Sequence, residues 1–376
     1  MGERAAFIYA DGLTRHVLSE THPLKSVRLR YTYELLAAYG VFESPDAMLL
    51  EPRPATEEEL LRFHTQPYMD CVRRISRGDY SGNPVPFGLG PGDNPIYEGM
   101  YEASLLSTGA SMRAAEVLLE GEADRAFSIS GGLHHAMPAN ASGFCVFNDP
   151  VVAIEELLLH GMKVAYVDID CHHGDGVQHA YYDTDAVLTV SVHESGAFLF
   201  PGTGFTEETG SGKGRGYSVN LPLYPYTTDE VYLWAFREVV PPLLEAYAPD
   251  VVVTQLGIDS HFRDPITHMA LTVQGFGEAV GELAGVAPKW LALGGGGYDL
   301  QAVARAWTTA YAIMLDRDLP DEIPEPYRQK HRVSTLSDHD APPDAESFQQ
   351  DARTFAEKSI QALHRDIFPT HRLRGA

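Results

Sequence analysis

The chain has 376 residues, of which 44% are apolar and 21% charged, with 28 basic side chains against 52 acidic ones. This composition is globular and excludes general disorder, and the net charge of −24 argues against partners such as nucleic acids or anionic membrane surfaces. Three cysteines cannot form a disulfide framework, and no apolar run approaches the roughly 18 residues of a membrane span, so we expect a soluble cytoplasmic protein.

Short apolar runs alternate along the chain with longer stretches that carry helix signals. Several of these runs are apolar throughout, which is typical of strands covered on both faces in a parallel sheet. The alternation predicts an α/β fold, with a doubly wound sheet between layers of helices. We expect strands at 7–9, 126–130, 164–169, 187–192, 251–256 and 290–293.

Capping patterns predict where three of the helices begin. Thr56 and Thr227 are each followed three residues later by a glutamate, which matches the capping box. Asp149 stands before a proline, and this order is typical of an N-cap followed by the first helical residue.

Two further segments complete the predicted organisation. Residues 83–95 are rich in Gly and Pro and therefore predict a loop. Beyond about residue 315 the chain becomes polar and is interrupted by prolines, with one more helix expected near 346–363. We interpret the chain 1–376 as a single domain, with a core over about 5–315 and a C-terminal helical appendage over about 316–376.

The densest polar cluster follows the third predicted strand. Asp168, Asp170 and His172 alternate along the chain, so on an extended strand they would point to one face. A carboxylate and an imidazole that converge at a strand end make half of a site for a first-row metal ion. His173 and Asp175 add further titratable groups, which is more than a turn that caps a helix requires.

Three other predicted strands also lead into chemically active residues. Asp259 is either a third metal ligand or the N-cap of a helix, and this residue alone does not distinguish the two. His134 and His135 follow a Gly-Gly turn and, each with a carboxylate to orient it, would form a general acid–base pair. Tyr298 ends a run of four glycines, which lets the backbone approach a site closely but lacks the GxGxxG spacing of a phosphate loop.

Together these motifs resemble the zinc-dependent histone deacetylases, with the closest likeness to the bacterial acetoin-utilisation deacetylases, which look like class I enzymes. The resemblance covers roughly residues 5–315 and implies an arginase/deacetylase-like fold, three layers α/β/α around a mostly parallel sheet of about eight strands. The matching stretches are His22-Pro-Leu-Lys, Ser107-Thr-Gly, Gly131-Gly-Leu-His-His, Gly143-Phe-Cys-Val-Phe-Asn-Asp, Asp168-Ile-Asp-Cys-His-His-Gly-Asp-Gly, Phe200-Pro-Gly-Thr-Gly, Gly257-Ile-Asp-Ser and Leu293-Gly-Gly-Gly-Gly-Tyr.

The resemblance implies two bound cations. Asp170, His172 and Asp259 would bind one catalytic Zn²⁺, although mixed oxygen and nitrogen ligands also accept Fe²⁺, Co²⁺ or Mn²⁺. Asp168 and Ser191 match side-chain ligands of a K⁺ site that family members have beside the zinc.

The resemblance also implies the catalytic residues. His135 would be the general base and then the general acid, and His134 would be its electrostatic companion. Asp168 would orient His134, and Asp175 would orient His135. Tyr298 would donate its hydroxyl to the oxyanion.

A narrow substrate tunnel is implied as well. Gly143 and Phe144 on one side and Phe200 on the other would flank it, with Ile266 near its mouth. Asp93 in the Gly/Pro-rich loop matches the aspartate at the rim that holds the substrate backbone.

The departures from the family pattern are few. Cys171 stands where an aliphatic residue is usual between the two ligands, and we expect it to be a buried thiol without a ligand role. The stretch 264–271 differs from the eukaryotic pattern near the tunnel mouth, which leaves the substrate preference open. We interpret His261 and His268 as structural.

The expected activity is metal-dependent hydrolysis of acetyl-lysine in proteins or peptides. The neighbouring alternative is an amidohydrolase for small acetylated amines such as acetylpolyamines. A binuclear manganese ureohydrolase is disfavoured, because it would need carboxylates where His173 and Ser260 stand. A non-catalytic binding protein is also disfavoured, because every predicted catalytic position has the expected residue. The acidic surface favours a cationic substrate or product, and the sequence does not indicate the oligomeric state.

Overall fold

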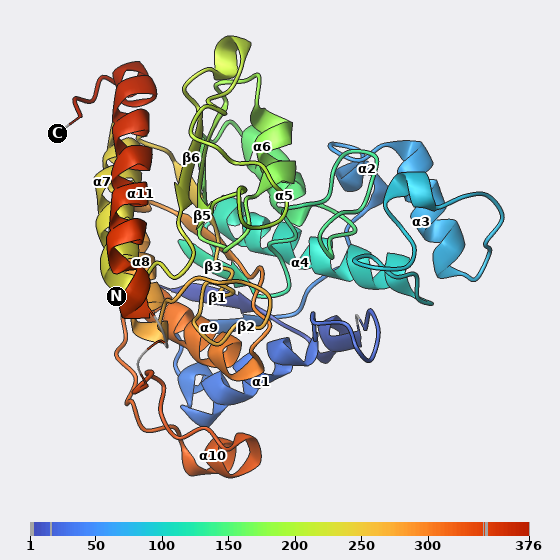
Figure 1. Ribbon diagram of the computed structural model, residues 1–376. Helices are drawn as coiled ribbons and strands as arrows, with labels where there is room; N and C mark the ends of the chain where they lie inside the picture. Colours follow the sequence, from blue (N-terminus) through green and yellow to red (C-terminus); the bar gives the residue numbers. More distant parts are fainter. Residues whose placement is uncertain (1–3, 16, 341, 343–344, 376) are drawn as a thin grey trace.

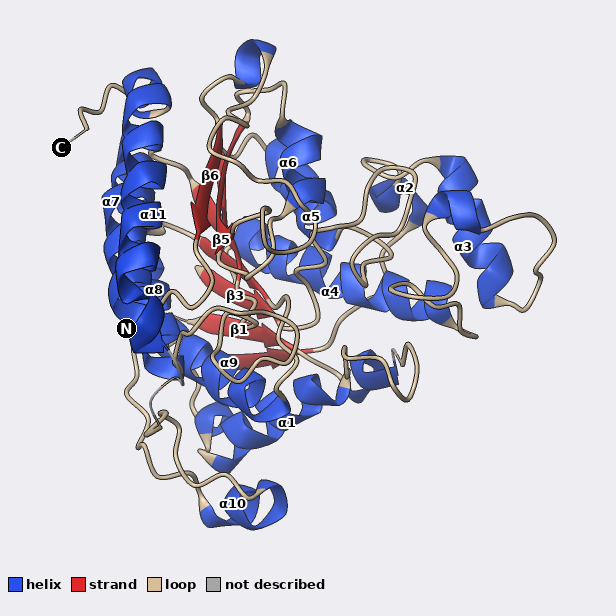
Figure 2. Ribbon diagram, viewed as in Figure 1, coloured by secondary structure: helices blue, strands red, loops and turns tan. Residues whose placement is uncertain are grey.

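The computed structural model describes residues 4–15, 17–340, 342 and 345–375. At its centre lies one sheet of eight parallel strands in the order β2-β1-β3-β8-β7-β4-β5-β6 (Figures 1 and 2). The strands are β1 (Ala5–Ile8), β2 (Ala47–Leu50), β3 (Arg125–Ser128), β4 (Val164–Asp168), β5 (Val187–Glu194), β6 (Ser218–Leu223), β7 (Val251–Gln255) and β8 (Trp290–Leu293).

The described part of the chain contains eleven α-helices, most of which cover the two faces of this sheet. They are α1 (Val27–Ala38), α2 (Glu57–Leu60), α3 (Gln66–Ser76), α4 (Met100–Glu120), α5 (Asp149–Leu159), α6 (Asp175–Tyr181), α7 (Asp229–Tyr247), α8 (Val273–Val286), α9 (Leu300–Met314), α10 (Glu325–His331) and α11 (Ala345–Asp366). One layer contains α7, α8, α9 and α1, packed in that order, and the other contains α4, α5 and α6 (Figure 2). The predicted three-layer α/β/α architecture is therefore confirmed. None of the described helices has the length and hydropathy that a membrane crossing requires.

Six of the eight strands agree with the predicted ones to within two residues at each end. The other two, β2 and β6, lie at the two edges of the sheet. The sequence of β2 is Ala-Met-Leu-Leu, which has no β-branched residue, and β6 contains Pro222. An edge strand tolerates a proline because one of its sides needs no backbone N–H. The proline that weakens the strand pattern of β6 is therefore also typical of an edge strand.

The two predicted capping boxes have different outcomes. At Thr56 the box is present: Thr56 Oγ1 accepts the N–H of Glu59 at 3.2 Å, and the N–H of Thr56 donates to the Glu59 carboxylate at 2.7 Å. At Thr227 the prediction is wrong, because α7 begins one residue later with Thr228 as its N-cap. The hydroxyl of Thr227 instead donates to the carbonyl of Tyr224 at 2.6 Å.

The C-terminal part of the chain contains more helix than predicted. It contains α10 in addition to the expected helix, which is α11 and packs against α7 and the edge strand β6. Between α10 and α11, Asp338 anchors the chain to the core. Its carboxylate hydrogen-bonds His261 at 2.9 Å and the N–H of Val273 at 2.8 Å, and it forms an ion pair with Arg305 at 2.8 Å. Of the predicted span 1–376, residues 1–3, 16, 341, 343–344 and 376 lie outside the described part.

Replacing Asp338 by alanine is expected to lower the free energy of unfolding by about 3 kcal/mol, because the buried guanidinium of Arg305 would lose its counter-ion. Urea denaturation of the two proteins measures this difference. Asp340→Ala is the matched control: Asp340 pairs with Arg263 at the surface, and its loss should change stability by less than about 1 kcal/mol. Equal effects of the two substitutions would contradict an anchoring role of Asp338.

Candidate active site

The four predicted motifs follow strands that are neighbours in the sheet. The strands β3, β8, β7 and β4 are consecutive, and the carboxyl ends of parallel strands meet at one edge. Residues from three of these strand ends line one small cavity of about 20 Å³: His134, His135, Asp170, His172 and Tyr298.

The candidate metal ligands form one buried group. Asp170, His172 and Asp259 each offer a ligand atom, and these atoms all lie within 4.8 Å of one another. His172 Nδ1 is 3.2 Å from Asp170 Oδ1 and 2.9 Å from Asp259 Oδ2. In the described part of the chain, no other cluster of histidine, cysteine and acidic residues meets this criterion. Two carboxylates and one imidazole are a suitable donor set for a first-row divalent ion.

The electrostatics of this group also fit a cation. Burial, together with the neighbouring Asp170, raises the pKa of Asp259 to about 6. Burial opposes a charge on His172, yet Asp259 and Asp170 raise the pKa of His172 well above its usual value. The buried carboxylates therefore favour a positive charge at this place, and a divalent ion supplies one.

Asp170 and His172 are positioned by a loop and not by an extended strand. Strand β4 ends at Asp168, one residue before its predicted end, so Asp170 and His172 lie in the following loop and do not share the face of an extended strand. Cys171 between them is buried; its N–H donates to Asp259 Oδ1 at 2.7 Å, and its thiol faces Glu194 at 3.7 Å. The loop thus turns its two predicted ligands towards β7 and its thiol away from them.

The glycine run lies directly against the two carboxylates. The N–H of Gly296 donates to Asp170 Oδ2 at 2.7 Å, and a Cβ at Gly296 would lie only 2.1 Å from Asp259 Oδ2. Gln255, which was not among the predicted residues, donates from Nε2 to the same Asp170 oxygen at 2.6 Å. A buried amide at the end of an otherwise apolar strand is the signal that identifies such a residue.

Two histidine–carboxylate pairs stand beside the candidate ligands. His134 Nδ1 lies 2.7 Å from Asp168 Oδ2, and His135 Nδ1 lies 2.7 Å from Asp175 Oδ1. The Nε2 atoms of the two imidazoles are 3.0 Å apart. Each ring thus turns Nδ1 to a carboxylate and Nε2 towards the cavity.

The two imidazoles have opposite pKa shifts. Burial lowers the pKa of His134, but Asp168 and Asp170 outweigh it and raise the value to about 9. Burial, followed by the charge of His134, lowers the pKa of His135 to about 4. These shifts favour a charged His134 and a neutral His135, whose Nδ1 faces Asp175 and whose Nε2 lies within hydrogen-bond distance of His134 Nε2.

Phe144 lines the cavity, and Phe200 packs against one of its histidines. The Phe144 ring is 5.7 Å from the ring of Tyr298, and the Phe200 ring, which is 43% exposed, is 5.1 Å from that of His135. A Cβ at Gly143, where φ is +48°, would lie 2.4 Å from the His135 ring, so only glycine allows this close approach. Burial raises the pKa of Tyr298 well above its usual value, which keeps its hydroxyl protonated and able to donate.

Comparison with known proteins agrees with this geometry. Residues 22–314 match the family model described as histone deacetylase domain. The chain belongs to the histone deacetylase family. It is 40% identical over 329 residues to the acetoin utilization protein AcuC of Bacillus subtilis, a match that covers 85% of this chain and 84% of that protein. It is 39% identical over 324 residues to histone deacetylase 1 of Homo sapiens, with coverage of 85% and 66%, respectively.

Solved structures of this family have the same fold. A histone deacetylase homologue from Aquifex aeolicus superposes with a TM-score of 0.86 at 32% identity, over 95% of this chain and all of that one. A histone deacetylase homologue in complex with SAHA gives a TM-score of 0.87 at 31% identity with the same coverage. The chain is therefore a hydrolytic enzyme of the metal-dependent deacetylase family.

The loop that bears the two histidines of this deacetylase is held from the start of α5. Asp149 accepts the N–H groups of Gly132 at 3.0 Å and Leu133 at 2.9 Å. Asn148 donates from Nδ2 to the carbonyl of His134 at 3.2 Å and, through Oδ1, caps α5. The prediction of Asp149 as the N-cap is thus wrong by one residue, because its carboxylate turns to the loop instead of the helix.

The predicted rim residues lie on two loops. Asp93 is exposed, and its backbone carbonyl lies 3.2 Å from the ring nitrogen Nε2 of His22. Ile266 is half-buried, and its N–H donates to Asp264 Oδ1 at 3.1 Å. The second oxygen of Asp264 accepts the N–H of Tyr298 at 2.8 Å, so this residue, which was not predicted, ties the rim to the glycine run.

The remaining predicted residues, Ser191, His261 and His268, do not line the cavity. Ser191 stands opposite Asp168 in the pairing of β4 with β5 and bonds His193 at 2.8 Å. His261 is buried against Asp338, and His268 lies at the surface against the buried Glu194 at 3.0 Å.

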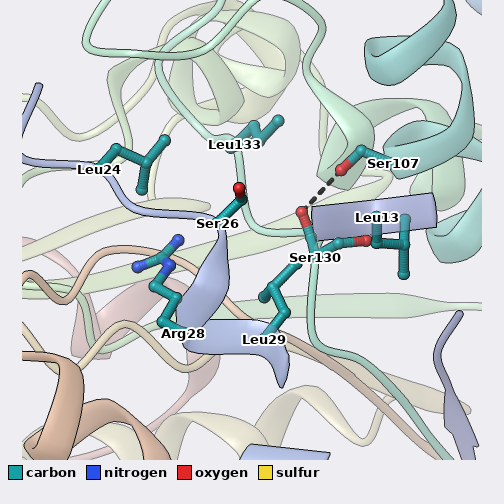
Figure 3. A pocket seen from close by; sticks show the side chains of 8 residues that line it. All are labelled: Leu13, Leu24, Ser26, Arg28, Leu29, Ser107, Ser130 and Leu133. Carbon is teal, nitrogen blue, oxygen red and sulfur yellow. Dashed lines mark hydrogen bonds between the residues drawn. The ribbon is translucent and has the colours of Figure 1, made fainter. Parts of the chain in front are cut away.

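A second small cavity adjoins the site of the deacetylase (Figure 3). It shares Leu24, Arg28 and Leu133 with the cavity that His134, His135 and Tyr298 line, and its volume of about 30 Å³ is enough for about one water molecule. Arg28 donates to the carbonyl of Gly297 at 2.8 Å and stacks over Trp307, so the guanidinium stands behind the tyrosine of the glycine run. The cavity is lined by Leu13, Leu24, Ser26, Arg28, Leu29, Ser107, Ser130 and Leu133.

Proposed function

We propose that this chain hydrolyses the acetyl amide of Nε-acetyl-lysine in proteins or peptides. The observation that carries the proposal is one cavity, lined by Phe144, that reaches Asp170 and His172 of the metal-ligand cluster, the imidazoles of both histidine–carboxylate pairs and Tyr298. The ring of Phe200 packs against one of these imidazoles, that of His135. An apolar, aromatic wall suits the acyl-lysine side chain, which is a hydrocarbon stem that ends in a neutral amide.

We also propose the bound ions. Asp170, His172 and Asp259 would hold Zn²⁺, and their donor atoms also suit Fe²⁺, Co²⁺ or Mn²⁺. When bound, such an ion supplies Lewis acidity that polarises the acetyl carbonyl and acidifies the attacking water. A K⁺ ion is proposed beside Asp168 and Ser191, which face each other across two paired strands.

The chain's own groups supply the proton transfers and the orientation. In this proposal, His135 Nε2 takes a proton from the attacking water and then returns it to the leaving lysine amine, while Asp175 holds the ring. The positive charge of His134 and the hydroxyl of Tyr298 stabilise the negative charge that develops on the carbonyl oxygen. Asp93 at the rim would hold the substrate backbone.

Asp175→Asn is expected to lower kcat about 100-fold, because an amide does not stabilise the imidazolium that His135 becomes during the reaction. Steady-state kinetics with an acetyl-lysine peptide measures the effect, and the metal content should remain that of the wild type. Asp185→Asn, at an exposed aspartate, is the matched control and should leave kcat unchanged. If Asp175→Asn keeps full turnover, His135 is not the base that this carboxylate orients.

Turnover of an acetyl-lysine peptide against an acetylpolyamine tests the proposed substrate class. We expect the peptide to have the higher kcat/KM. A higher value for the acetylpolyamine would instead assign the chain to the amidohydrolases of small acetylated amines.

In this proposal the whole chain, with the appendage 316–376, forms one catalytic domain. The packing of α11 against β6 and α7 supports this, as does the anchoring of Asp338 to His261 in the core. The excess of 24 negative charges would attract basic polypeptides around an acetylated lysine.

A further inference from the structure

A surface hollow of about 400 Å³ lies beside the catalytic cavity. It is formed by the Gly/Pro-rich loop and by the turn that precedes Phe144. Gly143 lines both the hollow and the catalytic cavity, and Asp93 stands in the wall of the hollow. The hollow therefore adjoins the place where the proposed tunnel would open. Its lining is Val85, Gly88, Leu89, Gly90, Pro91, Asp93, Asn94, Ala141, Ser142 and Gly143.

The walls of this hollow are fixed to each other. The N–H of Ala141 donates to the carbonyl of Phe87 at 2.9 Å, and the N–H of Gly90 donates to the carbonyl of Asn94 at 3.0 Å. A Cβ at Gly88, where φ is +70°, would lie 2.0 Å from the carbonyl oxygen of Ala141, so the loop and the turn are in direct contact. The hollow is a built feature and does not depend on an unsupported loop.

Most of the lining that is open to solvent is apolar, and Asn94 in the lining has a hydrogen-bond acceptor without a partner among the described residues. Val85 is 65% exposed and offers an aliphatic surface to an occupant of the hollow. Asn94 is 6% exposed, and its Oδ1 has no hydrogen-bond partner among the described residues. This oxygen is buried behind the surface of the hollow, so the part open to an occupant is the apolar surface and Asp93, which is proposed to hold the substrate backbone. Such a surface suits a polypeptide.

We propose that this hollow binds a residue adjacent to the acetyl-lysine of a polypeptide substrate and prefers an apolar side chain there. The inference rests on the proposed function. An extended peptide advances by at most about 3.6 Å per residue, so a chain whose acetyl-lysine passes Gly143 brings its neighbours over the hollow. A small acetylated amine has no backbone that continues in this direction, so the hollow also separates polypeptides from acetylpolyamines.

A set of acetyl-lysine peptides tests this assignment. Each peptide has glycine at every flanking position except one, which carries leucine at −2, −1, +1 or +2, and blocked acetyl-lysine amide serves as the substrate without neighbours. For at least one position, leucine should raise kcat/KM about fivefold over glycine, mainly through KM. In Val85→Ser the gain should fall below about twofold, while turnover of blocked acetyl-lysine amide stays unchanged.

The matched control is Leu159→Ser, which removes an equally exposed aliphatic side chain, 67% exposed, from the end of α5. It should keep the leucine gain. The assignment is overturned if no position prefers leucine, or if the gain survives in Val85→Ser or disappears in Leu159→Ser as well. Failure of the enzyme to process any acetyl-lysine substrate, blocked acetyl-lysine amide included, would overturn the proposed function and this inference with it.

Discussion

Tyr298→Phe is expected to lower kcat by about 100- to 1,000-fold while the protein keeps its metal, because the substitution removes only one donor to the developing oxyanion. Burial raises the pKa of the Tyr298 hydroxyl well above its usual value, so the hydroxyl is protonated at neutral pH and able to donate. The ring itself packs against Phe144, and phenylalanine preserves this contact. Steady-state kinetics and metal analysis of the same preparation measure the two effects.

Tyr327→Phe is the matched control for this substitution. Tyr327 is also buried, and its hydroxyl has no hydrogen-bond partner among the described residues, so its removal should change neither kcat nor stability. Full turnover by Tyr298→Phe would show that oxyanion stabilisation comes from elsewhere in the site. A loss of metal in this variant would show that the tyrosine also supports the ligands.

Asp170→Ala is expected to abolish metal binding and thereby to lower turnover by at least about 1,000-fold. Asp170 is one of three candidate ligands, and it also accepts the N–H of Gly296 and the amide of Gln255, so its loss removes a ligand and the contact that positions the glycine run. Metal content per chain after dialysis measures the first effect directly. Addition of a chelator should lower the melting temperature of the wild type and leave that of the variant unchanged.

Asp170→Asn separates loss of the ligand from loss of the fold. It keeps the size of the side chain and one acceptor oxygen, so the variant should fold while binding metal far more weakly than the wild type. Asp185→Ala, at an exposed position, should keep full metal content. Stoichiometric metal in folded Asp170→Ala would rule out Asp170 as a ligand.

The convergence of the site could be predicted from sequence because it depends on a general property of parallel sheets. The motifs around His134, Asp170, Asp259 and Tyr298 each follow a predicted strand, and parallel strands bring their carboxyl ends to one edge in any order. The order itself, in which β8 separates β3 from β7, depends on pairing between distant segments. No local pattern encodes such pairing. The sequence therefore indicates which residues form the site but not which strands lie side by side.

The supporting residues were harder to predict, because a polar residue near a helix start has several possible partners. Asp149 matches an N-cap by its position before a proline, yet it bonds the loop of His134 and His135. Gln255 and Asp264 act in the same way, since each bonds a segment that is distant in sequence. The edge strands β2 and β6 were missed for a related reason: their few residues have weak strand preference, and pairing with one neighbour defines them.

The position of β8 has a consequence for the synthesis of this enzyme. It is the last strand to leave the ribosome, yet it fills the middle of the sheet between β3 and β7. Until residues 290–293 emerge, the earlier strands can pair only as two separate groups, β2-β1-β3 and β7-β4-β5-β6. The histidine pair and the aspartate–histidine cluster then belong to different groups, so an unfinished chain has no complete site. Hydrolase activity should therefore arise late and all at once during translation.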